Sequence, residues 1–167
     1  MMGTQMRAFT FAGPSAPSRL TEIATPEPGP GELRIRVGAN TVCGTDLRIL
    51  RDEKTKGVDL GVVLGHEVSG HVDAVGDGVR NFEIGDLVAM PPSLICGLCG
   101  PCRRGYEHLC ERVHLVGYDV NGGLADYMLM PRVAVAKGLL MKAPATLEPA
   151  QLSLARRHTQ RPPVQSC

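Results

Sequence analysis

Residues 62–89 read VVLGHEVSGHVDAVGDGVRNFEIGDLVA, a stretch in which short apolar segments alternate with glycines. The apolar segments are residues 62–64, 72–75 and 87–89, and glycines stand at positions 65, 70, 76, 78 and 85. Runs of valine and leucine that are bounded by glycine are typical of short strands joined by tight turns. This stretch therefore predicts a mainly β fold.

The sequence on either side continues the β pattern. Residues 32–37 alternate polar and apolar side chains, which is the period of a half-buried strand. Residues 43–50 are expected to form one or two helical turns, with Thr41 or Thr45 as the N-cap. Further strands are expected at residues 6–11, 124–130 and 133–135. We predict a β barrel with short helices, interrupted by a cysteine-rich excursion.

The composition is that of an ordinary globular chain of 167 residues, with 43% hydrophobic and 21% charged residues. A net charge of +1 excludes the strongly basic surface that is typical of nucleic-acid-binding proteins. No window approaches the roughly 18 consecutive apolar residues of a membrane span, and the N-terminus lacks the pattern of a secretory signal. We therefore expect a cytoplasmic protein with reduced cysteines and with neither nucleic-acid nor membrane partners.

Four cysteines within one short segment are predicted to bind a structural zinc ion: Cys96, Cys99, Cys102 and Cys110. Structural zinc sites take four tetrahedral thiolate or imidazole ligands, and two-residue spacers let neighbouring cysteines converge on one ion. Isolated thiols this close together would be prone to oxidation. An iron–sulfur cluster is disfavoured because the last gap here is seven residues, not the three of the nearest ferredoxin spacing.

A second set of possible metal ligands consists of Cys43, His66 and Glu67. A catalytic zinc uses three protein ligands and leaves the fourth position open, and these three residue types are acceptable ligands. Each residue also has an ordinary explanation, as a core cysteine, a hydrogen-bonded histidine or a solvated glutamate. The sequence alone does not show that Cys43 and His66 meet in space.

Several motifs in order nevertheless resemble one family, the zinc-dependent medium-chain dehydrogenases, which include alcohol, polyol and threonine dehydrogenases. The motifs are Cys43-Gly44-Thr45-Asp46, Gly65-His66-Glu67-x2-Gly70-x5-Gly76, the four-cysteine segment and Gly122-Gly123-Leu124-Ala125-Asp126-Tyr127. The resemblance covers residues 6–154. It implies a GroES-like β barrel that carries a structural-zinc lobe and forms the catalytic domain.

The resemblance also implies roles for individual residues. Cys43 and His66 would bind a catalytic zinc, and Glu67 would be a ligand or an exchanging neighbour of that zinc. Thr45 would be the hydroxyl that takes the proton of the substrate, and Asp46 would orient the imidazole of His66. The substrate would be a small alcohol or polyol that is oxidised with NAD(P), by a protein that could form homo-oligomers.

Two departures from the family pattern bear on activity. Arg48 occupies a position where many members carry a proton-relaying histidine, and a guanidinium cannot relay protons in the same way. No G-x-G-x-x-G motif occurs, so we expect the Rossmann cofactor domain to be missing. Residues 155–160 also depart from the segment that supplies the last zinc ligand in the family, so we expect one ligand of the catalytic zinc to be missing. The expected organisation is a catalytic domain at 1–154 and an atypical, disordered tail at 155–167.

These observations predict a truncated N-terminal zinc-binding catalytic domain of an NAD(P)-dependent alcohol or polyol oxidoreductase, without turnover as an isolated chain. The alternative is a non-catalytic module that is held together by zinc.

Overall fold

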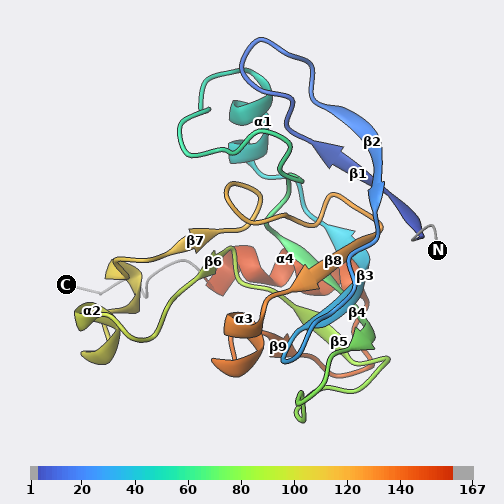
Figure 1. Ribbon diagram of the computed structural model, residues 1–167, viewed down its shortest axis with the longest axis vertical. Coiled ribbons are helices and arrows are strands. Elements are labelled where there is room, and N and C mark those ends of the chain that lie inside the picture. Colours follow the sequence, from blue (N-terminus) through green and yellow to red (C-terminus); the bar gives the residue numbers. More distant parts are fainter. Residues whose placement is uncertain (1–3, 160–167) are drawn as a thin grey trace.

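The computed structural model describes residues 4–159 and is built around a five-stranded antiparallel sheet (Figure 1). The strand order in this sheet is β8-β3-β4-β5-β9. The bounds of these strands are Tyr127–Met130 for β8, Leu33–Asn40 for β3, Val68–Val75 for β4, Leu87–Ala89 for β5 and Met141–Lys142 for β9. The central pair, β3 and β4, comes from the alternating segment and from the glycine-punctuated stretch that predicted the β fold.

Two small two-stranded sheets complete the β structure of residues 4–159. Strands β1 (Gln5–Thr10) and β2 (Arg19–Ala24) form a hairpin, which touches the rest of the fold through the isolated bridges Ala8↔Ala125 and Thr10↔Val63. Strands β6 (Ser93–Leu94) and β7 (His114–Leu115) form the base of the cysteine-rich lobe, which projects away from the large sheet in Figure 1. The described part of the chain has mainly strands and a few short helices, which confirms the predicted mainly β fold class. Its strands form separate open sheets rather than one continuous hydrogen-bonded ring.

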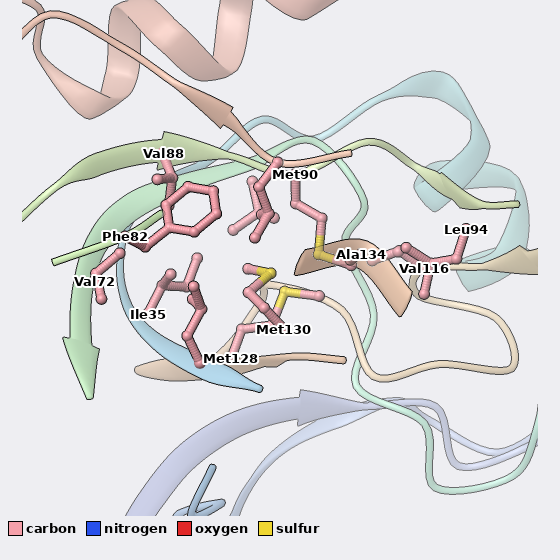
Figure 2. Close-up of a cluster of buried hydrophobic side chains, with 13 residues drawn as sticks. Ile35, Val72, Phe82, Val88, Met90, Leu94, Val116, Met128, Met130 and Ala134 are labelled. Atoms are coloured by element: carbon pink, nitrogen blue, oxygen red, sulfur yellow. The ribbon is translucent and has the colours of Figure 1, made fainter. Parts of the chain in front are cut away.

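The main hydrophobic core lies against the five-stranded sheet (Figure 2). Leu33 and Ile35 of β3 are completely buried because alternate side chains of a strand point to the same face. Figure 2 shows how side chains from the strands and from the loops between them meet in this core: Ile35, Val72, Phe82, Val88, Met90, Met128, Met130 and Ala134. Four of these residues are methionine or alanine and only Phe82 is aromatic, in keeping with a chain that has only 4% aromatic residues and no Trp.

Truncating the core at Ile35 is expected to destabilise the domain strongly. The Ile35→Ala variant should lose about 2–5 kcal/mol of unfolding free energy, because it leaves a cavity in a close-packed interior. Chemical denaturation monitored by circular dichroism measures this loss. The matched control is Ile84→Ala, whose side chain is 72% exposed and whose replacement should change stability by less than about 0.5 kcal/mol. Equal effects at the two positions would contradict this description of the core.

The described residues form four α-helices, and the two discussed first, α1 and α3, differ in detail from the sequence-based expectation. Helix α1 (Gly44–Leu50) was expected, but its N-cap is Cys43 rather than Thr41 or Thr45. Residues 133–135, expected as a strand, lie in helix α3 (Arg132–Ala136). Three apolar residues in a row are too few to distinguish the periods of helix and strand, and the proline at position 131 has the backbone angles of a helix N-cap. Helix α2 spans Gly100–Arg103.

Two further strand predictions were wrong in extent. Residues 62–64 form no strand, and only Val63 makes an isolated bridge to β1. The predicted strand at 124–130 begins at Tyr127, because the residues before it hydrogen-bond to β1 instead: the amide of Phe9 donates to the carbonyl of Leu124 at 2.7 Å. Strand β2 was not predicted at all. Its partner β1 lies where a strand was expected. Residues 19–24 form a strand by pairing with β1, and the sequence did not predict that pairing.

Helix α4 (Pro149–Thr159) packs beside β3, β4 and β5 and was not predicted (Figure 1). Two hydroxyl groups fix its first turns to the sheet: Ser69 Oγ donates to the carbonyl of Pro149 at 2.6 Å, and Thr41 Oγ1 lies 2.9 Å from Ser153 Oγ. Because the helix runs to Thr159, the boundary expected at residue 154 falls inside it, and 155–159 are helical. The remaining part of the expected disordered tail, residues 160–167, lies outside the described residues.

None of the described helices has both the length and the apolar character that a membrane crossing requires.

Candidate metal centres

The first candidate centre is the cysteine-rich lobe between β6 and β7. The sulfur atoms of Cys96, Cys99, Cys102 and Cys110 all lie within 4.8 Å of one another. All of these cysteines except Cys96, which is half-buried, are buried. Helix α2 carries Cys102, and a short 3-10 helix at Glu107–Leu109 precedes Cys110. The structure therefore gathers the four cysteines into one cluster, as their spacing predicted.

Backbone amides point at the sulfur atoms of this lobe. The amides of Leu98 and Cys99 each donate to Cys96 Sγ at 3.4 Å, and the amide of Cys96 donates to Cys110 Sγ at 3.3 Å. The two donors from Leu98 and Cys99 lower the pKa of the Cys96 thiol to about 6. Such amide donors favour sulfur in the thiolate form, which is the form that binds metals.

Cys102 has the opposite tendency. Burial, followed by the neighbouring sulfurs of Cys99 and Cys110, raises the pKa of the Cys102 thiol to about 12. Thiolates this close repel one another in a buried setting, and a shared cation removes that repulsion. The lobe thus offers four sulfur donors, and a bound metal ion would be needed to hold Cys102 as a thiolate beside the others.

The second candidate centre begins at the N-terminus of α1. Cys43 is the N-cap residue: its Sγ accepts a hydrogen bond from the amide of Thr45 at 3.2 Å. In return, the carboxylate of Asp46 accepts a hydrogen bond from the amide of Cys43 at 2.9 Å. This reciprocal pair is a capping box, and it fixes the Cys43 sulfur at the start of a helix, where negative charge is favoured.

His66 and Glu67 reach the same place from the turn before β4. Gly65 has a φ of +91°, and a side chain there would meet Asn40 and Leu124 at 2.8 Å, so the sharp entry into β4 requires glycine. The turn places His66 Nε2 only 3.0 Å from Cys43 Sγ. A carboxylate oxygen of Glu67, the imidazole of His66 and the sulfur of Cys43 lie within 4.8 Å of one another. The structure thus brings together all three residues that the sequence could only suggest.

Asp46 connects the helix to the imidazole. Its Oδ1 lies 3.4 Å from His66 Nδ1, which is long for a hydrogen bond, and Asp46 is only 2% exposed. Burial raises the pKa of Asp46, but the nearby imidazole of His66 and the hydrogen bond from the amide of Cys43 outweigh burial and leave the pKa below its ordinary value. Within the described chain, Asp46 Oδ1 and His66 Nδ1 are buried without a well-formed hydrogen bond. An imidazole that binds a metal through Nε2 would use this contact at Nδ1 to hold its orientation.

The three donors face a cavity of about 280 Å³. Its lining residues are Cys43, Thr45, His66, Glu67, Pro92, Leu115, Val116 and Tyr118. Thr45 was predicted to lie at this site, whereas Tyr118 was not. A tyrosine just after a glycine in a connecting segment carries no sequence signal of such a site, and only the fold brings residue 118 next to residue 66. Arg48 is not among the lining residues, and its guanidinium lies 4.0 Å from the carboxylate of Glu53.

Comparisons with known proteins agree with this architecture. The chain is 38% identical over 138 residues to L-threonine 3-dehydrogenase from Pyrococcus abyssi. The aligned residues make up 81% of this chain and 40% of the relative. A solved structure from Sinorhizobium meliloti 1021, assigned to the zinc-binding dehydrogenases and bound to NADP, superposes with a TM-score of 0.81 at 31% identity. That superposition covers 90% of this chain and 42% of the other.

A third similar protein is a cobalt- and zinc-bound thermostable alcohol dehydrogenase from Pyrobaculum aerophilum. The TM-score is 0.75 at 29% identity, over 90% of this chain and 44% of the other. The chain therefore spans about 40% of the length of the relatives it matches. Residues 29–142 match the family of alcohol dehydrogenase GroES-like domains. With its open β architecture and its two clusters of candidate metal ligands, this chain belongs to the alcohol dehydrogenase GroES-like domain family.

Proposed function

We propose that this chain is the zinc- and substrate-binding catalytic domain of an NAD(P)-dependent alcohol or polyol oxidoreductase. The observation that carries the proposal is the convergence of Cys43, His66 and Glu67 on one cavity, with the hydroxyl-bearing Thr45 in its wall. Relatives described as dehydrogenases, one with bound zinc and another with bound NADP, support this assignment.

The two clusters suit two different kinds of zinc site. Four cysteine sulfurs within 4.8 Å of one another form a closed donor set, which is typical of structural zinc. Cys43, His66 and Glu67 supply three donors beside a cavity, which is typical of a catalytic site with an open position. Zinc bound there supplies Lewis-acid polarisation of an alcohol hydroxyl.

The remaining proposed roles belong to side chains around the cavity. Thr45 would accept the proton that leaves the alcohol, because a hydroxyl both donates and accepts hydrogen bonds. Asp46 would hold the imidazole of His66 by accepting a hydrogen bond from Nδ1–H. Pro92, Leu115 and Val116 would give the carbon chain of the alcohol an apolar wall to pack against.

The acceptor of the hydride would be NAD(P), as expected from the family resemblance. Since the chain spans about 40% of its relatives, oxidation of an alcohol or polyol is proposed for the protein to which this domain belongs. We propose residues 1–154 as the core of the catalytic domain. The cytoplasmic location and homo-oligomer formation also remain predictions.

The alternative function is a non-catalytic module that zinc holds together. The observation in its favour is that, among the described residues, only the cysteine lobe offers four grouped ligands, whereas the second cluster offers three. Native mass spectrometry after titration with Co²⁺ and Zn²⁺ distinguishes the two. The catalytic-domain proposal predicts one tightly held ion and a second, weaker ion that is lost in Cys43→Ser. A single ion per chain at every metal concentration would favour the zinc-stapled module.

Asp46→Asn is expected to weaken the second metal centre without unfolding the chain. Asparagine retains a carbonyl that can accept the amide hydrogen bond of Cys43, but it lacks the negative charge that steadies His66 Nδ1–H. Loss of such a partner behind a metal ligand lowers metal affinity by about 10- to 100-fold. Competition with a chelator measures the affinity. A variant that binds the second ion as tightly as the parent would show that Asp46 does not orient His66.

A further inference from the structure

Tyr118 is the polar group of the cavity that the proposed chemistry leaves unused. Its side chain is only 8% exposed, and its ring centre lies 6.3 Å from that of His66. Beyond the three metal-ligand candidates and Thr45, the cavity is lined by Tyr118 and by three apolar residues, Pro92, Leu115 and Val116. Within this lining, the phenol hydroxyl is thus the one further side-chain hydrogen-bonding group.

The backbone around Tyr118 is fixed. Its amide donates to the carbonyl of Leu115 at 3.1 Å, and its carbonyl accepts from the amide of Asp59 at 2.8 Å. The preceding Gly117 has a φ of +76°, and a side chain there would lie 3.1 Å from the backbone of Gly65. The turn that presents Tyr118 therefore packs directly against the turn that presents His66. A side chain held on such a support is already in place before a ligand arrives.

The ring itself is also held, and its hydroxyl stays protonated. The ammonium group of Lys54 lies 5.3 Å from the centre of the Tyr118 ring, within the range of a cation–π contact. A phenol is protonated at neutral pH, and its hydroxyl both donates and accepts hydrogen bonds. Tyr118 therefore contributes a hydrogen-bond donor to the lining of the cavity.

We propose that Tyr118 is a ligand-positioning residue whose hydroxyl donates a hydrogen bond to a second polar group of an alcohol held at the Cys43–His66–Glu67 centre. The inference rests on the proposed function and narrows its substrate class. A cavity of about 280 Å³ has room for a small molecule. The favoured ligands are small alcohols with a neighbouring hydroxyl or carbonyl group, rather than simple monohydric alcohols.

The test uses the full chain loaded with Co²⁺, whose visible spectrum reports ligands that reach the second centre. The probes are 2,3-butanediol and 2-butanol, which differ by one hydroxyl group. The parent chain should bind the diol more tightly, and Tyr118→Phe should weaken diol binding by about five- to tenfold, the effect of one lost hydrogen bond. Binding of 2-butanol should change by less than about twofold. The matched control is Tyr106→Phe, because Tyr106 is 53% exposed and lies in the cysteine lobe.

The outcomes separate the inference from the function on which it rests. A diol preference that survives in Tyr118→Phe, or a parent chain that binds the two probes equally, would overturn the role of Tyr118. If Co²⁺ gives no thiolate absorption that depends on Cys43, the second metal centre is absent, and the proposed function fails together with the inference.

Discussion

Cys102→Ser is expected to abolish tight zinc binding by the cysteine lobe. The apparent free energy of zinc binding in four-ligand structural sites is about 10–16 kcal/mol, or roughly 2.5–4 kcal/mol per ligand. Loss of one thiolate should therefore weaken zinc binding by roughly 100- to 1,000-fold. The lobe has few other means of staying ordered, since several of its apolar side chains are exposed: Leu98 at 56%, Tyr106 at 53% and Leu109 at 59%.

Two measurements check this result. Zinc content after dialysis against a weak chelator should fall from one ion per chain to nearly none. Limited proteolysis with trypsin should cut faster at Arg103 and Arg104, because α2 and the turn after it depend on the lobe. Cys167→Ser is the matched control, a cysteine-to-serine change outside the described residues, and it should leave both readouts unchanged. Full zinc content in Cys102→Ser would contradict the assignment of this cysteine as a ligand.

Cys43→Ser should have the second large effect, and it should be confined to the other centre. Serine is a favoured N-cap residue, so α1 should remain folded when the sulfur is replaced by oxygen. The weaker, second ion should nevertheless be lost, with an affinity that falls by roughly 100-fold or more. With Co²⁺ as the probe, the near-ultraviolet thiolate absorption of this centre should disappear, while the ion in the cysteine lobe is retained.

Each of the two cysteine variants is expected to lose one ion and to keep the other. Cys102→Ser should lose the tight ion, and Cys43→Ser should lose the weak one. A Cys43→Ser chain that retains two ions would show that the 3.0 Å approach of Cys43 Sγ to His66 Nε2 is an ordinary sulfur–imidazole contact and not half of a metal site. Loss of both ions in either variant would mean that the two centres are not independent.

The sequence predicted those parts of the fold in which neighbouring residues already form a clear pattern. The alternation at residues 32–37 and the valine-rich segment at 72–75 lie in β3 and β4, and residues 87–89 coincide with β5. The cysteine cluster was equally accessible, because its ligands are close in the chain. In each of these cases the local pattern and the tertiary environment favour the same structure.

The parts that the sequence did not predict depend on distant partners. Helix α4 was missed because its buried face is short: Leu152 and Ser153 are the buried residues of its described side chains, and hydroxyl contacts to Thr41 and Ser69 hold its first turns. Tyr118 was missed for a similar reason, since only the packing of its turn against the turn at Gly65 brings it to the cavity. The meeting of Cys43 with His66 was suggested by the family resemblance and not by the spacing of 23 residues between them.

The central claim is that the four cysteines of the lobe share one tetrahedral zinc ion beside a GroES-like β domain. X-ray absorption at the zinc edge, on the chain loaded with one equivalent of zinc, measures this most directly. We predict a single shell of four sulfur atoms at about 2.3 Å from the metal. A first shell made mainly of nitrogen and oxygen, or one with two or fewer sulfur atoms, would contradict the claim.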